Sequence, residues 1–418
     1  MKLKKILGLS LFFCTFYSLI IPGIYFTLSD LFFTILFTML IIKNFSDNSI
    51  LYNNNLKMSL FSLSLILGGY LVSGIFNTIS IGDYTSMSIQ YIFVFAILMY
   101  VMNNFKSDTL LKLSEMILLG ISFITLFSSF LKFFLPSIYT NLINLGIFIG
   151  DARLGGFIGA NGLSKTIVLC IPLLYVLYTN NVISRRKTFI YILIFIFGLI
   201  QASSFGGLIS FVITAVILWL LNNIFIKKTF LTNIFLLIKN AVIGIFVVSF
   251  VLFINNFFKL ELFNVFSERV LKTIFQENIS EAGSFNIKFS LMETGLNFIQ
   301  SSPIIGIGYG NFSKENVYEQ NIHNLYISLW VEGGLLSFIG LLLFILYFLF
   351  ISLKILMSSK NKYSISIGIG LFALTLAFSI NIFTGTSGYV RHTMIPLILI
   401  GTIASRQLKK VKEENRNE

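Results

Sequence analysis

Charge is scarce in this sequence: Asp, Glu, Lys and Arg make up 11% of the 418 residues, whereas 56% are hydrophobic. An ordinary soluble domain carries about 25% charged residues. A soluble fold of this size could not hide so many apolar side chains, 47 Phe among them, without an aggregating surface. The composition excludes a cytosolic enzyme and a disordered protein, and places the chain in a lipid bilayer.

Cysteine and histidine are also scarce, with two of each. Cys14 and Cys170 lie within apolar runs, so the chain has neither the disulfide framework of a secreted scaffold nor a cysteine metal site. A net charge of +13 can indicate nucleic-acid binding. It has no such meaning if the positions of Lys and Arg along the chain are explained by membrane orientation.

The apolar runs predict an all-α polytopic membrane protein with about twelve spans, since each crossing needs about 20 apolar residues. The first run, 6–42, is too long for one crossing, so we divide it at the Pro22-Gly23 turn. The basic start resembles a signal peptide, but no small-residue cleavage site follows, so we expect an uncleaved first helix. The other expected spans are 57–77, 84–102, 113–135, 163–179, 188–204, 207–224, 234–254, 325–350, 363–383 and, short, 392–405.

The distribution of Lys and Arg predicts that both termini are cytoplasmic. Twenty of the thirty basic residues fall in segments that this topology places inside. The outer turns at 22–30, 78–83 and 205–206 contain none. The basic balance is therefore mostly an orientation signal, and we expect no nucleic-acid partner.

The topology divides the chain into four parts. Residues 1–254 hold spans 1–9 and an outer loop at 136–162; residues 255–324 form a long extracytoplasmic loop. Residues 325–405 hold spans 10–12, and 406–418 form a cytoplasmic tail. Long structured loops are uncommon unless functional, so we expect the chemistry in the two outer loops.

Within the long loop, residues 284–301 predict an amphipathic helix. Its apolar residues recur at helical spacing, namely Phe285, Phe289, Met292, Leu296 and Ile299. The helix either lies on the membrane surface with that stripe down, or also holds Lys288 over the mouth of a cavity. Spacing alone leaves both possibilities open.

The Gly-rich segment that follows contains Gly306, Gly308 and Gly310. It lacks the glycine spacing and strand–helix context of a dinucleotide loop, so we expect close approach to a ligand or tight packing. His323 and Asn324 come next, at the start of a span, where a neutral His can accept a proton from a hydroxyl. Glu332 lies just inside that span, where a carboxylate needs a polar cavity or a partner.

Three outer cations are candidate ligands for an anion: Arg153, which lies in a Gly-rich bend before Asn161, Lys288, and Arg391. Arginine offers a fork of donors that suits phosphate oxygens, and lysine offers a point charge. Lys132 and Lys165 lie at span ends, and we interpret them as anchors at the membrane surface.

These motifs resemble the O-antigen polymerase and ligase superfamily over about residues 150–340. The matching residues are Arg153, Gly156, Phe157 and Asn161; Pro303, Gly306, Gly308, Gly310 and Phe312; and His323, Asn324, Glu332 and Gly334. The chain departs from the family pattern at Ser204-Phe205-Gly206, where an Arg is common, and at Lys288, which occupies the place of a family Arg.

The resemblance implies transfer of a glycan from an undecaprenyl-diphosphate carrier on the outer face of the bacterial cytoplasmic membrane. It implies basic residues at the diphosphate, a His near the acceptor hydroxyl, and neither a nucleotide sugar nor a metal or other cofactor. We expect His323 to act as the base, with inversion at the anomeric carbon because no carboxylate pair is evident.

We favour a polymerase that joins lipid-linked repeat units of O-antigen, capsule or exopolysaccharide. The alternatives are a ligase that moves the finished glycan to a lipid or protein acceptor, a transporter of lipid-linked oligosaccharides, and a structural membrane partner. Apart from Lys239 the mid-span positions are almost free of charge and no repeat is evident, which argues against a transporter. A chain-length regulator and a flippase are candidate partners.

Overall fold

The computed structural model describes residues 2–17, 20–21, 24–47, 54–77, 81–150, 153–227, 264–266, 285–385 and 390–417. The first half contains α1 (Lys2–Phe13), β1 (Ile20–Ile21), β2 (Ile24–Thr27), α2 (Leu28–Ser46), α3 (Asn54–Phe76), α4 (Ile81–Ile92), the π-helix η1 (Phe93–Leu98), α5 (Met99–Asn103), α6 (Ser107–Leu113), α7 (Glu115–Phe134), α8 (Pro136–Asn144), α9 (Ala160–Thr179) and α10 (Arg185–Ala202). The second half contains α11 (Phe205–Asn222), the π-helix η2 (Asn223–Lys227), α13 (Asn264–Phe266), α15 (Phe285–Ser301), α16 (Asn311–Glu315), α17 (Leu325–Ser358), α18 (Lys362–Phe383) and α19 (Arg391–Asn417).

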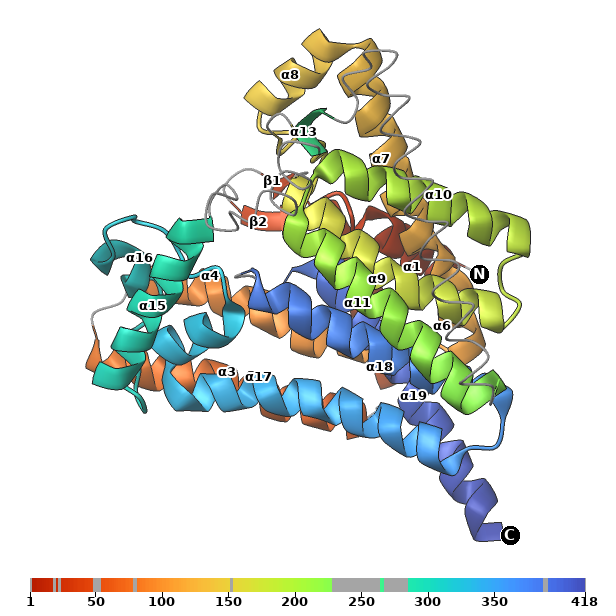
Figure 1. Ribbon diagram of the computed structural model, residues 1–418. Helices are drawn as coiled ribbons and strands as arrows, with labels where there is room; N and C mark the ends of the chain where they lie inside the picture. Colours follow the sequence, from red (N-terminus) through yellow and green to blue (C-terminus); the bar gives the residue numbers. More distant parts are fainter. Residues whose placement is uncertain are drawn as a thin grey trace.

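The fold is an all-α polytopic bundle, as the apolar runs predict (Figure 1). Within the described ranges, eight helical segments are long and apolar enough to cross a membrane. They are Leu28–Ser46, Asn54–Phe76, Ile81–Asn103, Ser107–Phe134, Ala160–Thr179, Phe205–Ile226, Leu325–Ser358 and Lys362–Phe383. The expected span at 234–254, with Lys239, lies outside the described residues. The expected number of twelve therefore stays a prediction.

The first and last expected spans differ from the prediction in a specific way. Helix α1 has 12 residues, about 18 Å of helix, which is short of the ~30 Å hydrocarbon core. The antiparallel strands β1 and β2 precede α2, and the division expected at Pro22-Gly23 lies outside the described residues. At the other end, α19 continues well past residue 405, and its first half is enclosed by the bundle.

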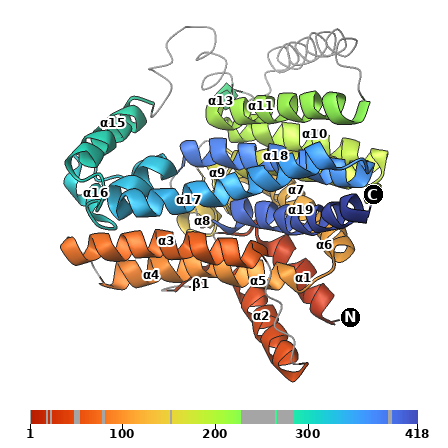
Figure 2. The same cartoon turned by 90° about the horizontal axis from the view of Figure 1, so that it is seen from below.

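Helices α3 and α17 lie side by side in both ribbon views (Figures 1 and 2). Small residues allow this close approach: a Cβ at Gly340 would lie 2.8 Å from the carbonyl oxygen of Ser62. Ser337 Oγ also donates to the carbonyl of Ile66 at 2.7 Å. Small side chains and interhelical hydrogen bonds are the usual means by which membrane helices associate.

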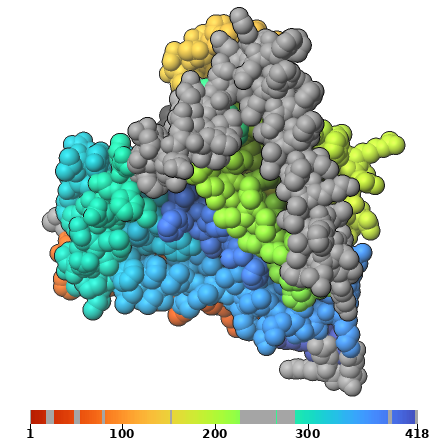
Figure 3. Space-filling view, in the orientation of Figure 1, coloured from red at the N-terminus to blue at the C-terminus, as the bar shows by residue number. Residues whose placement is uncertain are grey.

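The two ends of the bundle carry different parts of the chain. The N-terminus and the C-terminus lie at one end, and α15 and α16 lie at the opposite end (Figures 1 and 2). The space-filling view shows α15 and α17 forming adjoining parts of one surface (Figure 3). We refer to the end with α15 and α16 as the outer end, following the orientation expected from the basic residues.

Candidate active site

Helix α15 occupies the segment expected at 284–301, but its apolar residues are divided between two faces. Within the expected stripe, Phe289 and Leu296 are 60% and 49% exposed, so the membrane-facing stripe stays a prediction for these residues. Leu291 and Ile299 are buried instead, in a cluster with Phe312, Ile322 and Val331. A Cβ at Gly295 would lie 2.9 Å from the side chains of Ile322 and Ile327, so the glycine lets α15 settle closely on the start of α17.

Lys288 lies on the packed side of α15, because it precedes Leu291 by three residues and Met292 by four. It is half-buried, and its charge acts on His323. Of the two interpretations of this helix, the packing on α17 and the effect of the Lys288 charge on the pKa of His323 favour the one in which α15 positions Lys288.

His323 is positioned by the residue that follows it. Asn324 is the N-cap of α17, and its side chain accepts a hydrogen bond from the backbone N–H of Ile327 at 3.2 Å. The half-buried imidazole of His323 has no hydrogen-bond partner within the part of the chain that the structure describes. Burial lowers the pKa of His323 below its ordinary value, and the positive charges of Lys288 and Lys165 lower it further. The ring is therefore neutral near pH 7 and able to accept a proton.

Lys165 is the functional candidate that the sequence analysis missed by treating it as a surface anchor. Its Nζ donates to the carbonyls of Asn381 at 2.9 Å and Thr384 at 2.7 Å, at the end of α18. Asn381 Nδ2 donates back to the carbonyl of Lys165 at 3.1 Å. The available signal was a lysine within an otherwise uncharged span, and such residues usually have a specific partner.

The loop before α9 brings Arg153 to the same helix. Arg153 Nη1 donates to Asn161 Oδ1 at 3.2 Å, and Asn161 precedes Lys165 by one helical turn on the same face of α9. The loop is fixed by the Leu154 N–H, which donates to the carbonyl of Gln201 at 3.0 Å. Arg153, Lys165, Lys288 and His323 thus come from three separate segments of the outer end.

The Gly-rich turn packs tightly against a break in α17. Gly334 has φ +69° inside the helix, and the N–H of Ile307 donates across the break to the carbonyl of Val331 at 2.8 Å. A Cβ at Gly306 would lie 2.6 Å from the backbone nitrogen of Gly334. Of the two interpretations of this turn, the observed contacts show tight packing.

Glu332 finds its partner in the same turn. The buried carboxylate accepts a hydrogen bond from the N–H of Gly310 at 3.0 Å through Oε1. The backbone carbonyl of Glu332 accepts a hydrogen bond from the N–H of Gly308 at 3.1 Å. The Gly-rich turn and Glu332 therefore form one hydrogen-bonded unit. This unit supports the start of α17, which His323 precedes.

Arg391 is placed differently from the other predicted cations. Its Nε and Nη2 donate to the two carboxylate oxygens of Asp30 at 2.8 and 2.9 Å, and its Nη1 donates to Gln90 at 3.3 Å. The guanidinium also lies 5.1 Å from the ring centroid of Phe93. These contacts give Arg391 a structural role; the predicted role as a phosphate ligand stays a prediction.

The described residues contain no group of three or more His, Cys, Asp and Glu side chains that could hold a metal ion. The charges that lower the pKa of the His323 imidazole belong to two cations, Lys288 and Lys165. Such a group can neutralise an anion and accept one proton, which are the two requirements of transfer from a diphosphate leaving group.

The comparison with known families agrees with this chemistry. Residues 190–345 match the family model described as O-antigen ligase, which confirms the resemblance to the O-antigen polymerase and ligase superfamily. The match includes Lys288, the Gly-rich turn, His323 and Glu332, whereas Arg153, Lys165 and Arg391 lie outside it. No curated protein matches the chain.

The domain and the helices together define the class of protein. The chain is a multi-pass membrane protein whose residues 190–345 match an O-antigen ligase domain, and this match supports a function of the O-antigen ligase or polymerase type. Members of this family are membrane glycosyltransferase-like enzymes, and the family implies a lipid-linked oligosaccharide as substrate.

Proposed function

We propose that the chain is a polysaccharide repeat-unit polymerase of a bacterial cytoplasmic membrane. It transfers a growing glycan from an undecaprenyl-diphosphate carrier to the non-reducing-end sugar of another lipid-linked repeat unit. The observation that carries the proposal is the convergence of His323 with Lys288 and Lys165 at the outer end of a chain that has an O-antigen ligase domain.

The proposed reaction assigns roles to His323, Lys288 and Arg153. His323 takes the proton of the acceptor hydroxyl while the hydroxyl oxygen bonds to the anomeric carbon. The bond from that carbon to the diphosphate oxygen breaks, and the diphosphate leaves with its electron pair. Lys288 and Arg153 neutralise the charge on the departing diphosphate, so the reaction needs no metal ion.

We propose a single displacement with inversion at the anomeric carbon. A retaining reaction through a covalent intermediate uses two carboxyl groups about 5 Å apart. Glu332 is buried and bonded to the N–H of Gly310, which suits a carboxylate that supports the turn. His323, half-buried and without a hydrogen-bond partner in the described ranges, is better suited to the acceptor.

The polymerase is preferred over the ligase because of the two departures from the family pattern. The outer turn at Ser204-Phe205-Gly206 lacks the common Arg, and Lys288 stands where an Arg is common. A lysine neutralises phosphate without binding it at two points. These changes indicate a divergent member of the family. We place the site on the extracytoplasmic face because the opposite end carries most of the basic residues.

The test is reconstitution of the full chain in liposomes with a lipid-linked repeat unit as both donor and acceptor. A ladder of longer lipid-linked products supports a polymerase. His323→Ala should reduce that ladder at least 100-fold, while Asn321→Ala, at an exposed position two residues earlier, should leave it unchanged. An unaffected ladder with His323→Ala contradicts the assignment of the base. Transfer to a lipid or protein acceptor without a ladder identifies a ligase.

A further inference from the structure

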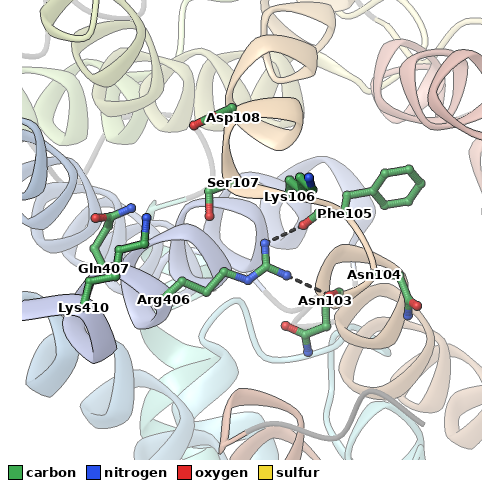
Figure 4. Close-up of a pocket in the computed structure, with 9 residues that line it drawn as sticks. All are labelled: Asn103, Asn104, Phe105, Lys106, Ser107, Asp108, Arg406, Gln407 and Lys410. Carbon is green, nitrogen blue, oxygen red and sulfur yellow. Dashed lines mark hydrogen bonds between the residues drawn. The ribbon is translucent and has the colours of Figure 1, made fainter. Parts of the chain in front are cut away.

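A hollow of about 460 Å³ lies between α6 and the second half of α19 (Figure 4). These parts of the chain lie at the end of the bundle opposite α15 and α16 (Figure 1). The hollow is lined by the end of α5, the turn to α6, the first residues of α6 and one face of α19. The lining residues that bear on a ligand are Lys106, Ser107, Asp108, Arg406, Gln407 and Lys410.

Positive charge dominates this hollow, because Lys106, Arg406 and Lys410 outnumber Asp108. Figure 4 shows Arg406 between the residues of α19 and those of the α5–α6 turn. Its guanidinium donates to two uncharged groups, the carbonyls of Phe105 and of Asn103, the latter at 2.7 Å. Across the described ranges, none of the three cations forms an ion pair with an acidic side chain. The hollow therefore has a positive charge that an anionic ligand can neutralise.

The surroundings indicate a lipid as the source of that anion. Asn104 Oδ1 accepts a hydrogen bond from Asn44 Nδ2 at 2.7 Å, which ties the rim of the hollow to the end of α2. Next to Asn44, Ile42 and Phe45 are 65% and 70% exposed. A basic, polar hollow thus adjoins exposed apolar side chains at the level where spans leave the membrane, which matches a phosphate headgroup with its acyl chains.

We propose that this hollow binds the phosphate of an anionic phospholipid of the cytoplasmic leaflet. The cations neutralise the phosphodiester, Ser107 and Gln407 are in place to bond the headgroup, and the acyl chains lie along the end of α2. The site is independent of the glycosyl transfer at the outer end, and the inference does not rest on the proposed function.

The experiment uses the full-length protein, stripped of lipid in a neutral detergent and titrated with phosphatidylglycerol or phosphatidylcholine. Bound lipid is counted by native mass spectrometry. Lys106→Gln with Lys410→Gln should weaken phosphatidylglycerol binding about 25-fold, at roughly fivefold for each cation. The matched control, Lys112→Gln with Lys412→Gln, removes two exposed lysines of the same helices that do not line the hollow. It should change binding less than twofold.

A gain-of-binding variant tests the same site without removing a cation. Asp108→Asn removes the one acidic lining residue and should strengthen phosphatidylglycerol binding about fivefold. Equal binding of phosphatidylglycerol and phosphatidylcholine overturns the proposal. An equal loss of phosphatidylglycerol binding in the two double lysine variants overturns it as well. Displacement of phosphatidylglycerol by an equal concentration of inorganic phosphate also overturns it, because the site would then be one for free phosphate.

Discussion

The guanidinium of Arg391 and the carboxylate of Asp30 form a two-point ion pair in the protein interior, 361 positions apart in the chain. The two side chains are 3% and 0% exposed. Asp30 also completes a capping box with Thr27 at the start of α2. One carboxylate therefore fixes the first turn of α2 and the first turn of α19 against each other.

Asp30→Asn should lower the stability of the protein by about 3 kcal/mol, because it leaves a buried guanidinium without its counter-charge. Arg391→Lys should have a similar effect, since an ammonium cannot reproduce the two-point contact. Thermal unfolding in detergent, followed by intrinsic fluorescence, measures both. Asp83→Asn, at an exposed position in the first turn of α4, is the control and should have little effect. A different outcome would contradict the structural role: both variants keep wild-type stability, and Arg391→Lys loses activity. Arg391 would then be a diphosphate ligand.

The activity of the protein should fall at acidic pH with a midpoint below 6.5, the ordinary pKa of histidine. The reason is that burial and the charges of Lys288 and Lys165 lower the pKa of His323, so the ring stays neutral to a lower pH. Lys288→Gln removes one of these charges, which raises the pKa and should shift the midpoint to higher pH. Lys288→Arg keeps the charge and should keep the midpoint. The pH profile of the initial rate, normalised to its maximum, separates this shift from any loss of substrate binding. A midpoint that stays unchanged in Lys288→Gln would show that His323 is not the titrating base.

Lys165→Met should reduce both the unfolding temperature and the rate, because the carbonyls of Asn381 and Thr384 lose the ammonium that joins α9 to the end of α18. Two lost charge-assisted hydrogen bonds correspond to about 3 kcal/mol. Lys132→Met is the matched control, because Lys132 also lies at the outer end of a span and its ammonium lies 5.9 Å from the centroid of the Phe133 ring. Equal effects of the two substitutions would return Lys165 to the role of a simple surface anchor.

Gly334→Ala should destabilise the start of α17 by more than about 2 kcal/mol. The residue has φ +69°, and a Cβ there would lie 2.7 Å from the backbone carbonyl carbon of Ile305. Gly310→Ala offers a comparison at almost the same backbone angle, φ +76°, but with nothing within 4 Å of the added Cβ. It should cost only about 1 kcal/mol of backbone strain. Unfolding temperatures of the two variants that coincide would show that the packing at Gly334 is not tight.

Much of the architecture follows from consecutive residues. The expected spans at 57–77, 163–179, 207–224 and 363–383 correspond closely to α3, α9, α11 and α18, because an apolar run long enough to cross the bilayer satisfies its backbone by forming a helix. The amphipathic helix at 284–301 was predictable in position but not in orientation. Its apolar residues fit more than one face, and only the contact with α17 decides which face is buried.

Composition and spacing are sufficient to place the chain in a membrane, to locate most of its helices and to single out the short motifs that need a chemical explanation. Hydropathy and motif spacing depend only on residues that are close together in the chain, so they can be evaluated without knowledge of the fold. Two relationships follow only from the fold: the charge of Lys165 lowers the pKa of His323, and Arg391 pairs with Asp30. The physical reason is that an ionisable side chain within a bundle takes its partner from whichever helix lies beside it, and that neighbour is fixed by packing rather than by position in the sequence.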